Sequence, residues 1–234
     1  MYASYVSSPP PRPWVAVHGS SDRFCVHRIY CVGRNYAAHV REMGGDPSRE
    51  LPIFFMKPAD AVVANGSDVP YPPRTGNLHH EVELVVAIGR GGANIAVGDA
   101  LSHVFGYAVG NDLTRRDLQA EAREKGQPWD TSKGFDQSAP VAAIHTVEQA
   151  GPMTDARIWL KVNDEIRQDA NISQMIWSVS EIIAELSTFY TLQAGDLIFT
   201  GTPDGIGPLL PGDSVTAGIY GLDTLQHRIV AGRE

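Results

Sequence analysis

Three carboxylates from two segments are the residues whose types and spacing could bind a metal ion. Glu81 and Glu83 alternate along the segment NLHHEVELVVAIG, residues 77–89. Alternate side chains of an extended strand point to one face, so the two carboxylates would lie side by side. A hard divalent cation such as Mg²⁺ or Mn²⁺ takes oxygen ligands and would relieve their repulsion. Asp112, which ends the strand-like segment VFGYAVGND, would add a third carboxylate.

Each carboxylate also has a simpler interpretation. Glu81 and Glu83 alone favour an edge strand whose polar face meets water, and the preceding His79 and His80 add little. An aspartate just before a helix, as Asp112 is, commonly caps that helix. The metal hypothesis therefore depends on the three carboxylates taken together.

A second group could activate water. His39 and Glu42 lie three residues apart in a predicted helix over 35–45, so they share one face of it. A carboxylate that orients and polarises an imidazole makes a general base. The alternative is a surface ion pair, which most such pairs are. Lys133 and Gln119 could bind a substrate, but neither stands out by itself.

The segment FTGTPDGIGP, residues 199–208, follows an apolar run and is rich in Gly and Pro. It is not a phosphate-binding P-loop, because no GK[ST] follows. Its glycines would let backbone N–H groups approach an anion closely. The alternative is a tight turn between two strands.

The hydrophobic pattern predicts more strands than helices. Strands are expected at 14–19, 27–33, 52–58, 83–89, 104–112, 196–201, 213–219 and 224–230. Residues 157–168 predict a hairpin, since Asn163 and Asp164 tolerate the positive φ angles of a two-residue turn. Because strands and helices do not alternate regularly, the pattern favours a mixed, strand-dominated α+β domain over a doubly wound or barrel fold.

Three helices are predicted to accompany these strands. The first, over 35–45, ends at Gly44 and Gly45. The second begins with a capping-box pattern from Thr114 to Asp117 and ends near Gly126. The third, over 178–190, is amphipathic, with apolar side chains at helical spacing: Ile182, Ile183, Leu186, Phe189 and Tyr190.

Length and composition narrow the class of protein. The 234 residues are 43% hydrophobic and 20% charged, which is typical of a globular protein with one large domain. The net charge of −8 argues against nucleic acid and against an anionic membrane as partners. Two cysteines favour a reducing cytoplasm over a disulfide scaffold. Residues 1–13, rich in Pro and Ser, predict an irregular arm. The first 14 residues lack the pattern of a signal peptide, and no apolar run is long enough to span a membrane.

Several motifs together resemble the fumarylacetoacetate hydrolase superfamily. They are RIYCVGRNYAAHVREMG, FFMKP, HHEVELVV, GYAVGNDLTRRDLQ, GQPWDTSKGFDQSAP, WLKVNDEIRQ and FTGTPDGIGP, and they cover the chain from about Arg28 to Val230. Within the superfamily they are most similar to the acylpyruvate hydrolase branch, and there to bacterial fumarylpyruvate hydrolases of gentisate breakdown. Two departures, VNDE for the usual VNGE and FCVHRIY for FPVRRIY, leave the functional residues unchanged.

The resemblance implies a fold, a metal site and a set of substrate contacts. It implies a mixed β-sandwich roll of the fumarylacetoacetase C-terminal-domain type with a few short helices, and a homodimer. Residues 1–27 would form an N-terminal arm and small cap strand, and residues 28–234 a single catalytic domain. One Mg²⁺ or Mn²⁺ per subunit would be held by Glu81, Glu83 and Asp112. The substrate would be held by Arg34, Gln119, Lys133 and Thr202.

The implied activity is hydrolysis of a 2,4-dioxo acid. His39 and Glu42 would form a dyad on a lid-like helix that activates water, and Lys133 would add positive charge where pyruvate leaves as its enolate. The expected reaction is fumarylpyruvate to fumarate and pyruvate. Alternatives within the superfamily are an oxaloacetate decarboxylase, another acylpyruvase, an isomerase or a hydratase. A metal-binding protein without turnover is a further alternative, but it would need neither the dyad nor Lys133.

Overall fold

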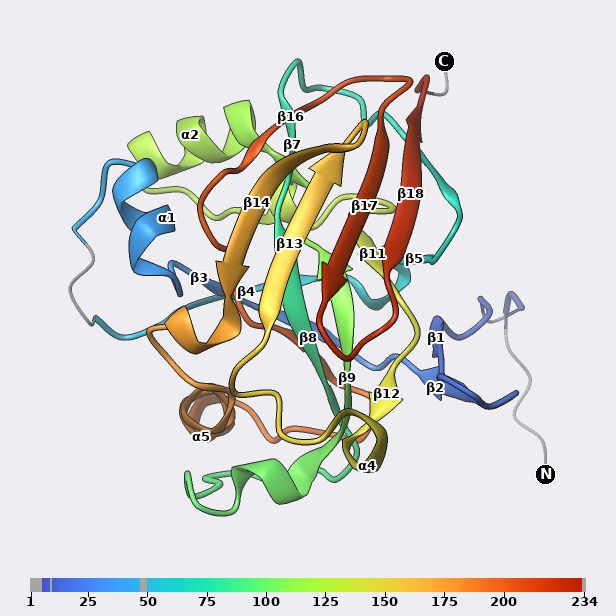
Figure 1. Ribbon diagram of the computed structural model, residues 1–234, viewed down its shortest axis with the longest axis vertical. Coiled ribbons are helices and arrows are strands. Elements are labelled where there is room, and N and C mark those ends of the chain that lie inside the picture. Colours follow the sequence, from blue (N-terminus) through green and yellow to red (C-terminus); the bar gives the residue numbers. More distant parts are fainter. Residues whose placement is uncertain (1–5, 9, 47–49, 233–234) are drawn as a thin grey trace.

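The computed structural model describes residues 6–8, 10–46 and 50–232, and Figure 1 shows its layers. The predicted irregular arm falls partly on residues 1–5 and 9, which lie outside the described residues. Residues 6–8 and 10–13 belong to no helix or strand. The remaining chain is dominated by strands with a few short helices, so the predicted α+β fold class is confirmed.

The largest sheet carries Glu83 on its central strand, and Glu81 lies directly before that strand. Its order is β4 (Ile53–Lys57), β3 (Ile29–Gly33), β15 (Leu197–Phe199), β8 (Val82–Ile88), β9 (Val104–Asn111), β11 (Ala139–Val141) and β5 (Val62–Ala64), and β12 (His145–Thr146) also pairs with β9. Strand β8 is antiparallel to both neighbours and every one of its residues is buried. The edge-strand interpretation of the glutamate pair is therefore wrong.

A second sheet curves over one face of the first. It contains β14 (Glu165–Asn171), β13 (Arg157–Val162), β17 (Ser214–Ile219), β18 (Leu225–Val230) and β6 (Asp68–Pro70), in that order. The predicted hairpin is β13 with β14, and its turn residues Asn163 and Asp164 have φ of 50° and 68°. This confirms a turn that needs positive φ at both positions.

Alternation along β8 divides its side chains between two hydrophobic cores. Val82, Leu84 and Val86 join the core between the two sheets, together with Ile158 and Leu160 of β13. On the opposite face, Val85 and Ala87 join a smaller core with Phe199, Ile29 and Cys31. Apolar contacts on both faces hold the strand rigidly, as a site built on it requires.

Two small sheets complete the strands. One contains β10 (Thr114–Arg115), β7 (Leu78–His80) and β16 (Gly207–Leu209), and the other is the hairpin of β1 (Trp14–Ala16) and β2 (Arg23–Cys25). Because β7 and β8 belong to different sheets, the strand expected over 77–89 divides at Glu81. The β1–β2 hairpin lies at the periphery, where Val15 and Val26 pack into the smaller core.

The helices cover the edges of these sheets. They are α1 (Ala37–Glu42), α2 (Arg116–Glu124), α3 (Asp130–Lys133), α4 (Val147–Ala150) and α5 (Val179–Phe189), and short 3₁₀ turns occupy Ala59–Ala61, Ala100–His103 and Ile172–Gln174. The predicted capping box from Thr114 to Asp117 is wrong, because α2 begins later, at Arg116, with no side-chain cap. Thr114 instead pairs with His79 in the β10–β7 ladder.

Helix α5 follows the prediction except at its C-terminal end. Ser178 and Glu181 form a capping box, and Ile182, Ile183 and Leu186 are buried. Phe189 and Tyr190, which were expected on the same buried face, are 64% and 39% exposed. Where the chain is described, no helix is long and apolar enough to cross a membrane. The division into residues 1–27 and 28–234 stays a prediction.

Candidate active site

The candidate site is a pocket beside the β3, β4 and β8 strands and the helices α1 to α3. Its volume is about 590 Å³ with the open solvent at its mouth included. Predicted site residues that line it are Arg34, His39, Glu81, Glu83, Gln119, Lys133 and Thr202. Glu42 and Asp112 do not line the pocket but contact residues that do.

Three buried carboxylates meet at the base of this pocket. Glu81, Glu83 and Asp112 are 4%, 2% and 0% exposed, and one oxygen of each lies within 4.8 Å of the others. The backbone fixes this arrangement, because Asp112 N donates to Glu81 O at 2.8 Å and the Asn111 side chain accepts from Glu81 N. Asp112 is therefore not a helix cap.

Three buried or nearly buried cations surround two of the carboxylates. Lys133 Nζ donates to Glu81 Oε2 at 2.8 Å, to Asp112 Oδ2 at 2.7 Å and to the Thr114 hydroxyl. Arg116 pairs with the other oxygen of Glu81. Lys57 Nζ lies 2.7 Å from Asp112 Oδ1, in an ion pair without hydrogen-bond geometry. Lys133 is 2% exposed, so it is not a solvated surface lysine.

Glu83 differs from its two neighbours. The backbone N–H of Gly201 donates to its Oε2 at 2.7 Å. Burial raises the pKa of Glu83 well above its ordinary value, and the charges of Asp112 and Glu81 raise it further. Burial also opposes the ionisation of Glu81, but Lys133 and Arg116 outweigh it and lower the pKa of that carboxyl.

The three carboxylates fit a hard divalent ion. All the donor atoms are oxygens, which Mg²⁺ and Mn²⁺ prefer, and they come from rigid strand ends. A dication would also favour the ionised form of Glu83, whose burial and anionic neighbours oppose its charge. The residues present can therefore bind one divalent metal ion.

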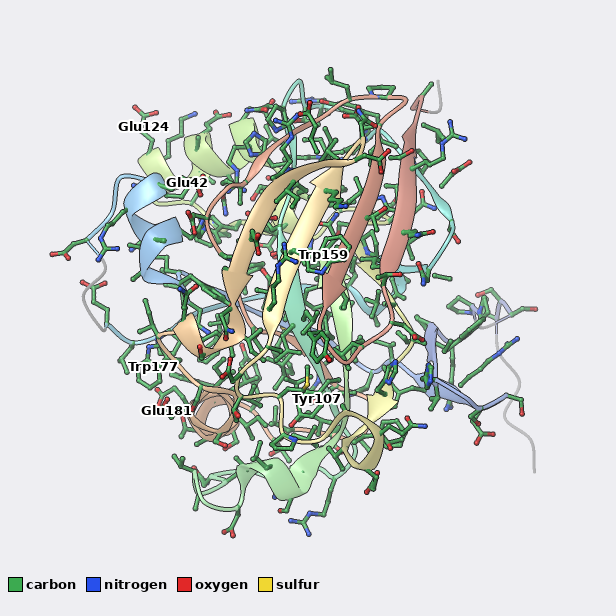
Figure 2. The ribbon with its side chains drawn as sticks, in the orientation of Figure 1. Glu42, Tyr107, Glu124, Trp159, Trp177 and Glu181 are labelled. Carbon is green, nitrogen blue, oxygen red and sulfur yellow. The ribbon has the colours of Figure 1, made fainter. Side chains whose placement is uncertain are left out.

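His39 and Glu42 form a fixed pair on α1. His39 Nδ1 lies 3.1 Å from Glu42 Oε2, and Gly205 N donates to Glu42 Oε1 at 3.0 Å. Burial opposes the ionisation of Glu42, but the hydrogen bonds from His39 and Gly205 lower its pKa overall. His39 is 8% exposed and lines the pocket, so the pair is more than a surface ion pair. Figure 2 shows Glu42 on α1, on the side of the molecule where α2 lies.

The Gly-rich loop over 199–208 orients two site glutamates. Gly201 and Gly205 have φ of +98° and +86°, and each turns its N–H toward a carboxylate, that of Glu83 and Glu42 respectively. A Cβ on Gly205 would lie 2.1 Å from Arg167 O. The backbone N–H groups of this loop thus bind the carboxylates of Glu83 and Glu42 and not an external anion.

The remaining predicted residues lie around the pocket with protein partners. Thr202 Oγ1 donates to Val82 O at 2.9 Å, and Gln119 accepts a hydrogen bond from Arg116. Arg34 lines the pocket wall and has φ of +61°, which is uncommon for a residue other than glycine. Such a backbone angle beside a pocket is typical of a constrained functional position.

Sequence reasoning missed five residues of the site: Arg116, Lys57, Arg123, Phe55 and Trp129. A signal existed for two of them. Arg116 stands three residues before Gln119 on one helix face, and Lys57 is a charge in an otherwise apolar strand. The Phe55 and Trp129 rings meet edge to face at 5.5 Å and form an apolar wall, with Lys133 over the Phe55 ring. Nothing local indicates that contact.

Known proteins share this architecture. A fumarylpyruvate hydrolase from Pseudomonas aeruginosa, solved in complex with Mn²⁺ and pyruvate, is 50% identical with a TM-score of 0.95, over 97% of this chain and 100% of that one. A putative fumarylpyruvate hydrolase from Burkholderia cenocepacia is 52% identical with a TM-score of 0.92, over 99% and 100%. The mitochondrial oxaloacetate tautomerase FAHD1 of Bos taurus is 43% identical over 201 residues, 86% of this chain and 90% of that protein.

The family model that matches describes the fumarylacetoacetate (FAA) hydrolase C-terminal domain, and it covers residues 28–230. That range contains the three carboxylates, the His39–Glu42 pair and Lys133. The resemblance drawn from the motifs is therefore confirmed, and the chain belongs to the fumarylacetoacetate hydrolase family of enzymes.

Proposed function

We propose that this protein is a metal-dependent hydrolase that cleaves a carbon–carbon bond of 2,4-dioxo acids, with fumarylpyruvate cleaved to fumarate and pyruvate in aromatic catabolism. The observation that carries the proposal is His39, oriented by Glu42, in the same pocket as Glu81 and Glu83 of the three-carboxylate cluster. Likeness to the Pseudomonas fumarylpyruvate hydrolase at 50% identity supports the choice of substrate.

Glu81, Glu83 and Asp112 would hold Mg²⁺ or Mn²⁺ in this enzyme. When bound, the ion supplies Lewis-acid stabilisation of negative charge that develops on substrate oxygens. Charged side chains around the carboxylates affect which substrate the metal-loaded site would bind. Lys57, Lys133 and Arg116 pair with Glu81 and Asp112 and equal the three carboxylates in number, so a bound dication with all three ionised leaves a net positive site that favours an anionic substrate.

His39 is the proposed general base. Because Glu42 engages Nδ1, the other ring nitrogen of His39 is left to take a proton from a water molecule in the pocket. Glu42 holds the ring orientation and stabilises the imidazolium that forms. Its own position is set by Gly205 N–H, so the loop over 199–208 and α1 fix the base together.

Lys133 and Arg116 are the proposed stabilisers of the leaving group. Cleavage between C3 and C4 of the dioxo acid releases pyruvate as its enolate, which is a poor leaving group in water. Lys133, buried between Glu81 and Asp112, keeps a positive charge next to the carboxylates that hold the ion. Fixed cations in a buried site stabilise developing negative charge with little reorganisation.

The pocket offers cations for a second carboxylate as well. Arg34 and Arg123 both line it, and Arg123 Nη1 also donates to Met43 O at the end of α1. Fumarylpyruvate carries a carboxylate at each end, while acetylpyruvate carries one. The proposed roles of Arg34, Gln119 and Thr202 are to hold the substrate's carboxylate and oxo groups.

Oxaloacetate is the second candidate substrate. The observation that favours it is the 43% identity to the oxaloacetate tautomerase of Bos taurus. Decarboxylation of oxaloacetate gives the same pyruvate enolate without an attacking water, so it would use Lys133 but not a water-activating base. Oxaloacetate turnover is therefore compatible with the same pocket.

A substrate panel tests the proposal. Fumarylpyruvate, acetylpyruvate and oxaloacetate are each incubated with the enzyme, and pyruvate is measured with lactate dehydrogenase, with and without EDTA. We expect fumarylpyruvate to give the highest kcat/KM and EDTA to abolish its cleavage. If only oxaloacetate yields pyruvate, the hydrolase assignment is wrong. If none of the three yields pyruvate, and the keto–enol interconversion of oxaloacetate followed by ultraviolet absorbance is not accelerated either, while Mn²⁺ still binds, the protein is a metal binder.

The proposal also includes a homodimer and a cytoplasmic location. Large apolar side chains that are exposed in one copy, among them Phe189 and Leu51, would be covered by a second copy. Cys25 and Cys31 are both free thiols, as a reducing compartment favours. Light scattering after size-exclusion chromatography tests the dimer, since a monomer mass would contradict it.

A further inference from the structure

A second group of potential metal ligands lies outside the pocket. His18 follows β1, His145 begins β12, and Asp223 lies in the turn between β17 and β18. One ligand atom of each lies within 4.8 Å of the others. Figure 1 shows β12 between the β1–β2 hairpin and the lower turn of β17 and β18. The cluster thus joins three segments that are far apart in the sequence.

The polar contacts within this cluster place no proton between His145 Nε2 and Asp223 Oδ1. His18 Nδ1 lies 2.7 Å from Asp223 Oδ2. His145 Nε2 accepts a hydrogen bond from Asp223 N at 3.1 Å, so this nitrogen carries a lone pair and no proton. The same nitrogen lies 3.4 Å from Asp223 Oδ1. An unprotonated imidazole nitrogen and a carboxylate oxygen therefore face each other.

That spacing suits a tetrahedral ion. Ligands about 2.0–2.2 Å from Zn²⁺ at the tetrahedral angle lie roughly 3.3–3.5 Å apart. The two imidazoles are stacked, with ring centroids 3.9 Å apart and an interplanar angle of 17°, so their in-plane lone pairs run nearly parallel and one ring must turn for both to bind the same ion. The His145 side chain is 9% exposed, while those of His18 and Asp223 are about two-fifths exposed, which leaves room for water as a fourth ligand.

The donor set differs in kind from that of the active-site pocket. Two imidazoles and one carboxylate are typical ligands for Zn²⁺, whereas three carboxylates suit Mg²⁺ or Mn²⁺. The protein would therefore bind Mg²⁺ or Mn²⁺ in the pocket and Zn²⁺ at the His18–His145–Asp223 cluster.

A second His–Asp pair, His27 with Asp196, provides a comparison in which donors contact both carboxylate oxygens. His27 Nδ1 lies 2.8 Å from Asp196 Oδ1, and Arg28 bonds both oxygens of the same carboxylate. Gln193 N donates to Asp196 Oδ2 as well. Within the described part of the chain, the hydrogen-bond partners of the Asp196 carboxylate are thus an imidazole, a guanidinium and a backbone N–H. Asp223 has one imidazole donor and faces an imidazole acceptor.

We propose that His18, His145 and Asp223 form a Zn²⁺ site that fastens the β1–β2 hairpin to β12 and to the β17–β18 turn. Backbone bonds already align the seam, because His18 N donates to Ile144 O at 2.9 Å and Ile144 N donates to Ala16 O at 2.8 Å. Binding replaces the Asp223 N–H bond to His145 and the His18 bond to Asp223 by bonds to the ion, and the metal-binding free energy adds to the stability of the docked hairpin.

Zinc titration of the full chain tests this site separately from the pocket. The Glu83→Ala variant lacks one pocket carboxylate, so calorimetry on it reports the hairpin site. We expect Glu83→Ala to keep one class of Zn²⁺ binding and Glu83→Ala/His145→Ala to lose it, with at least a tenfold fall in affinity. His27→Ala in the same background is the matched control, because it removes a His–Asp pair and is expected to bind Zn²⁺ unchanged.

Co²⁺ and thermal unfolding supply independent readouts. Co²⁺ in the Glu83→Ala chain should give the intense visible band of a four-coordinate, imidazole-bound ion, and this band should vanish in Asp223→Asn. Zn²⁺ should raise the Tm of the Glu83→Ala chain but not that of the chain with His18→Gln added. His18 is half-buried, with 42% of its side chain exposed, and the substitution keeps a polar side chain there, so the fold is expected to stay intact even if His145→Ala disrupts it. Absence of Zn²⁺ binding in Glu83→Ala, or binding that His145→Ala and His18→Gln leave unchanged, would overturn the proposal.

Discussion

Removing the imidazole of His39 should separate two reactions that share one pocket. Hydrolysis of an acylpyruvate needs an activated water, whereas decarboxylation of oxaloacetate needs only stabilisation of the enolate. The contacts of Lys133 with Glu81 and Asp112 do not involve His39. His39→Ala should therefore impair hydrolysis and leave the metal-binding carboxylates in place.

The expected loss follows from what the substitution removes. A positioned general base contributes about 10²–10⁴-fold in rate, or roughly 3–5 kcal/mol of transition-state stabilisation. The cost in stability is smaller, since a hydrogen bond to a charged group is worth about 1.5–3 kcal/mol at most. Glu42 keeps its bond from Gly205 N, and with 31% of its side chain exposed its charge stays hydrated. The variant should fold.

The assay follows pyruvate release from fumarylpyruvate and from oxaloacetate with the same enzyme sample. His39→Ala should lower kcat for hydrolysis by roughly 10²–10⁴-fold and oxaloacetate turnover far less. Glu42→Gln should act in the same direction with a smaller loss, because it weakens the base without removing it. Arg41→Ala, an exposed residue of the same helix, is the control and should change neither reaction. The reasoning is refuted if His39→Ala leaves hydrolysis intact or lowers both reactions equally.

Four further outcomes are expected. Alanine at any of the three pocket carboxylates should abolish Mn²⁺ binding by calorimetry, while Glu121→Ala on the exposed face of α2 should not; unchanged affinity in all three would show that the metal site is misassigned. The kcat/KM for fumarylpyruvate should exceed that for acetylpyruvate, and Arg123→Ala should lower the ratio of the two values. An unchanged ratio would exclude Arg123 from recognition of the second carboxylate. Because burial raises the pKa of Glu83, its contribution to the metal-free fold is full below the unfolded pKa and is lost as pH rises through the folded pKa. The Tm of the metal-free protein should therefore fall less with pH in Glu83→Gln, and identical pH profiles would contradict this. Gly205→Ala should lower both Tm and hydrolysis, since its Cβ would clash with the backbone and displace Glu42, and full activity would argue against the loop as the support of the dyad.

Local patterns in the sequence determined much of this protein. Period-two alternation identified β8 and placed Glu81 and Glu83 on one face, and helical spacing paired His39 with Glu42. Asn163 and Asp164 predicted the hairpin turn. These features are set by neighbours within a few residues, so they can be derived without knowing the fold. The motif resemblance added the family and the β-sandwich roll, whereas the hydrophobic pattern alone indicated only a strand-dominated α+β domain.

Only the tertiary structure decided which interpretation of each residue holds. The sequence allowed Glu83 at a solvent-exposed sheet edge and Asp112 as a helix cap. The fold instead buries Glu83 on a central strand of the large sheet and Asp112 directly after the neighbouring strand. The prediction for Thr114 failed for a related reason. Its hydroxyl donates to Asp112 O and accepts from Lys133, so tertiary partners displaced the local cap.

The contacts that make the site come from residues distant in the chain. Lys57 reaches Asp112 across 55 positions, and Gly201 reaches Glu83 across 118. Such contacts depend on strand order and register, which the composition of one segment does not specify. The sequence by itself therefore determined which side chains could do chemistry, and the packing of the sheets decided which of them are buried, paired and brought to one pocket.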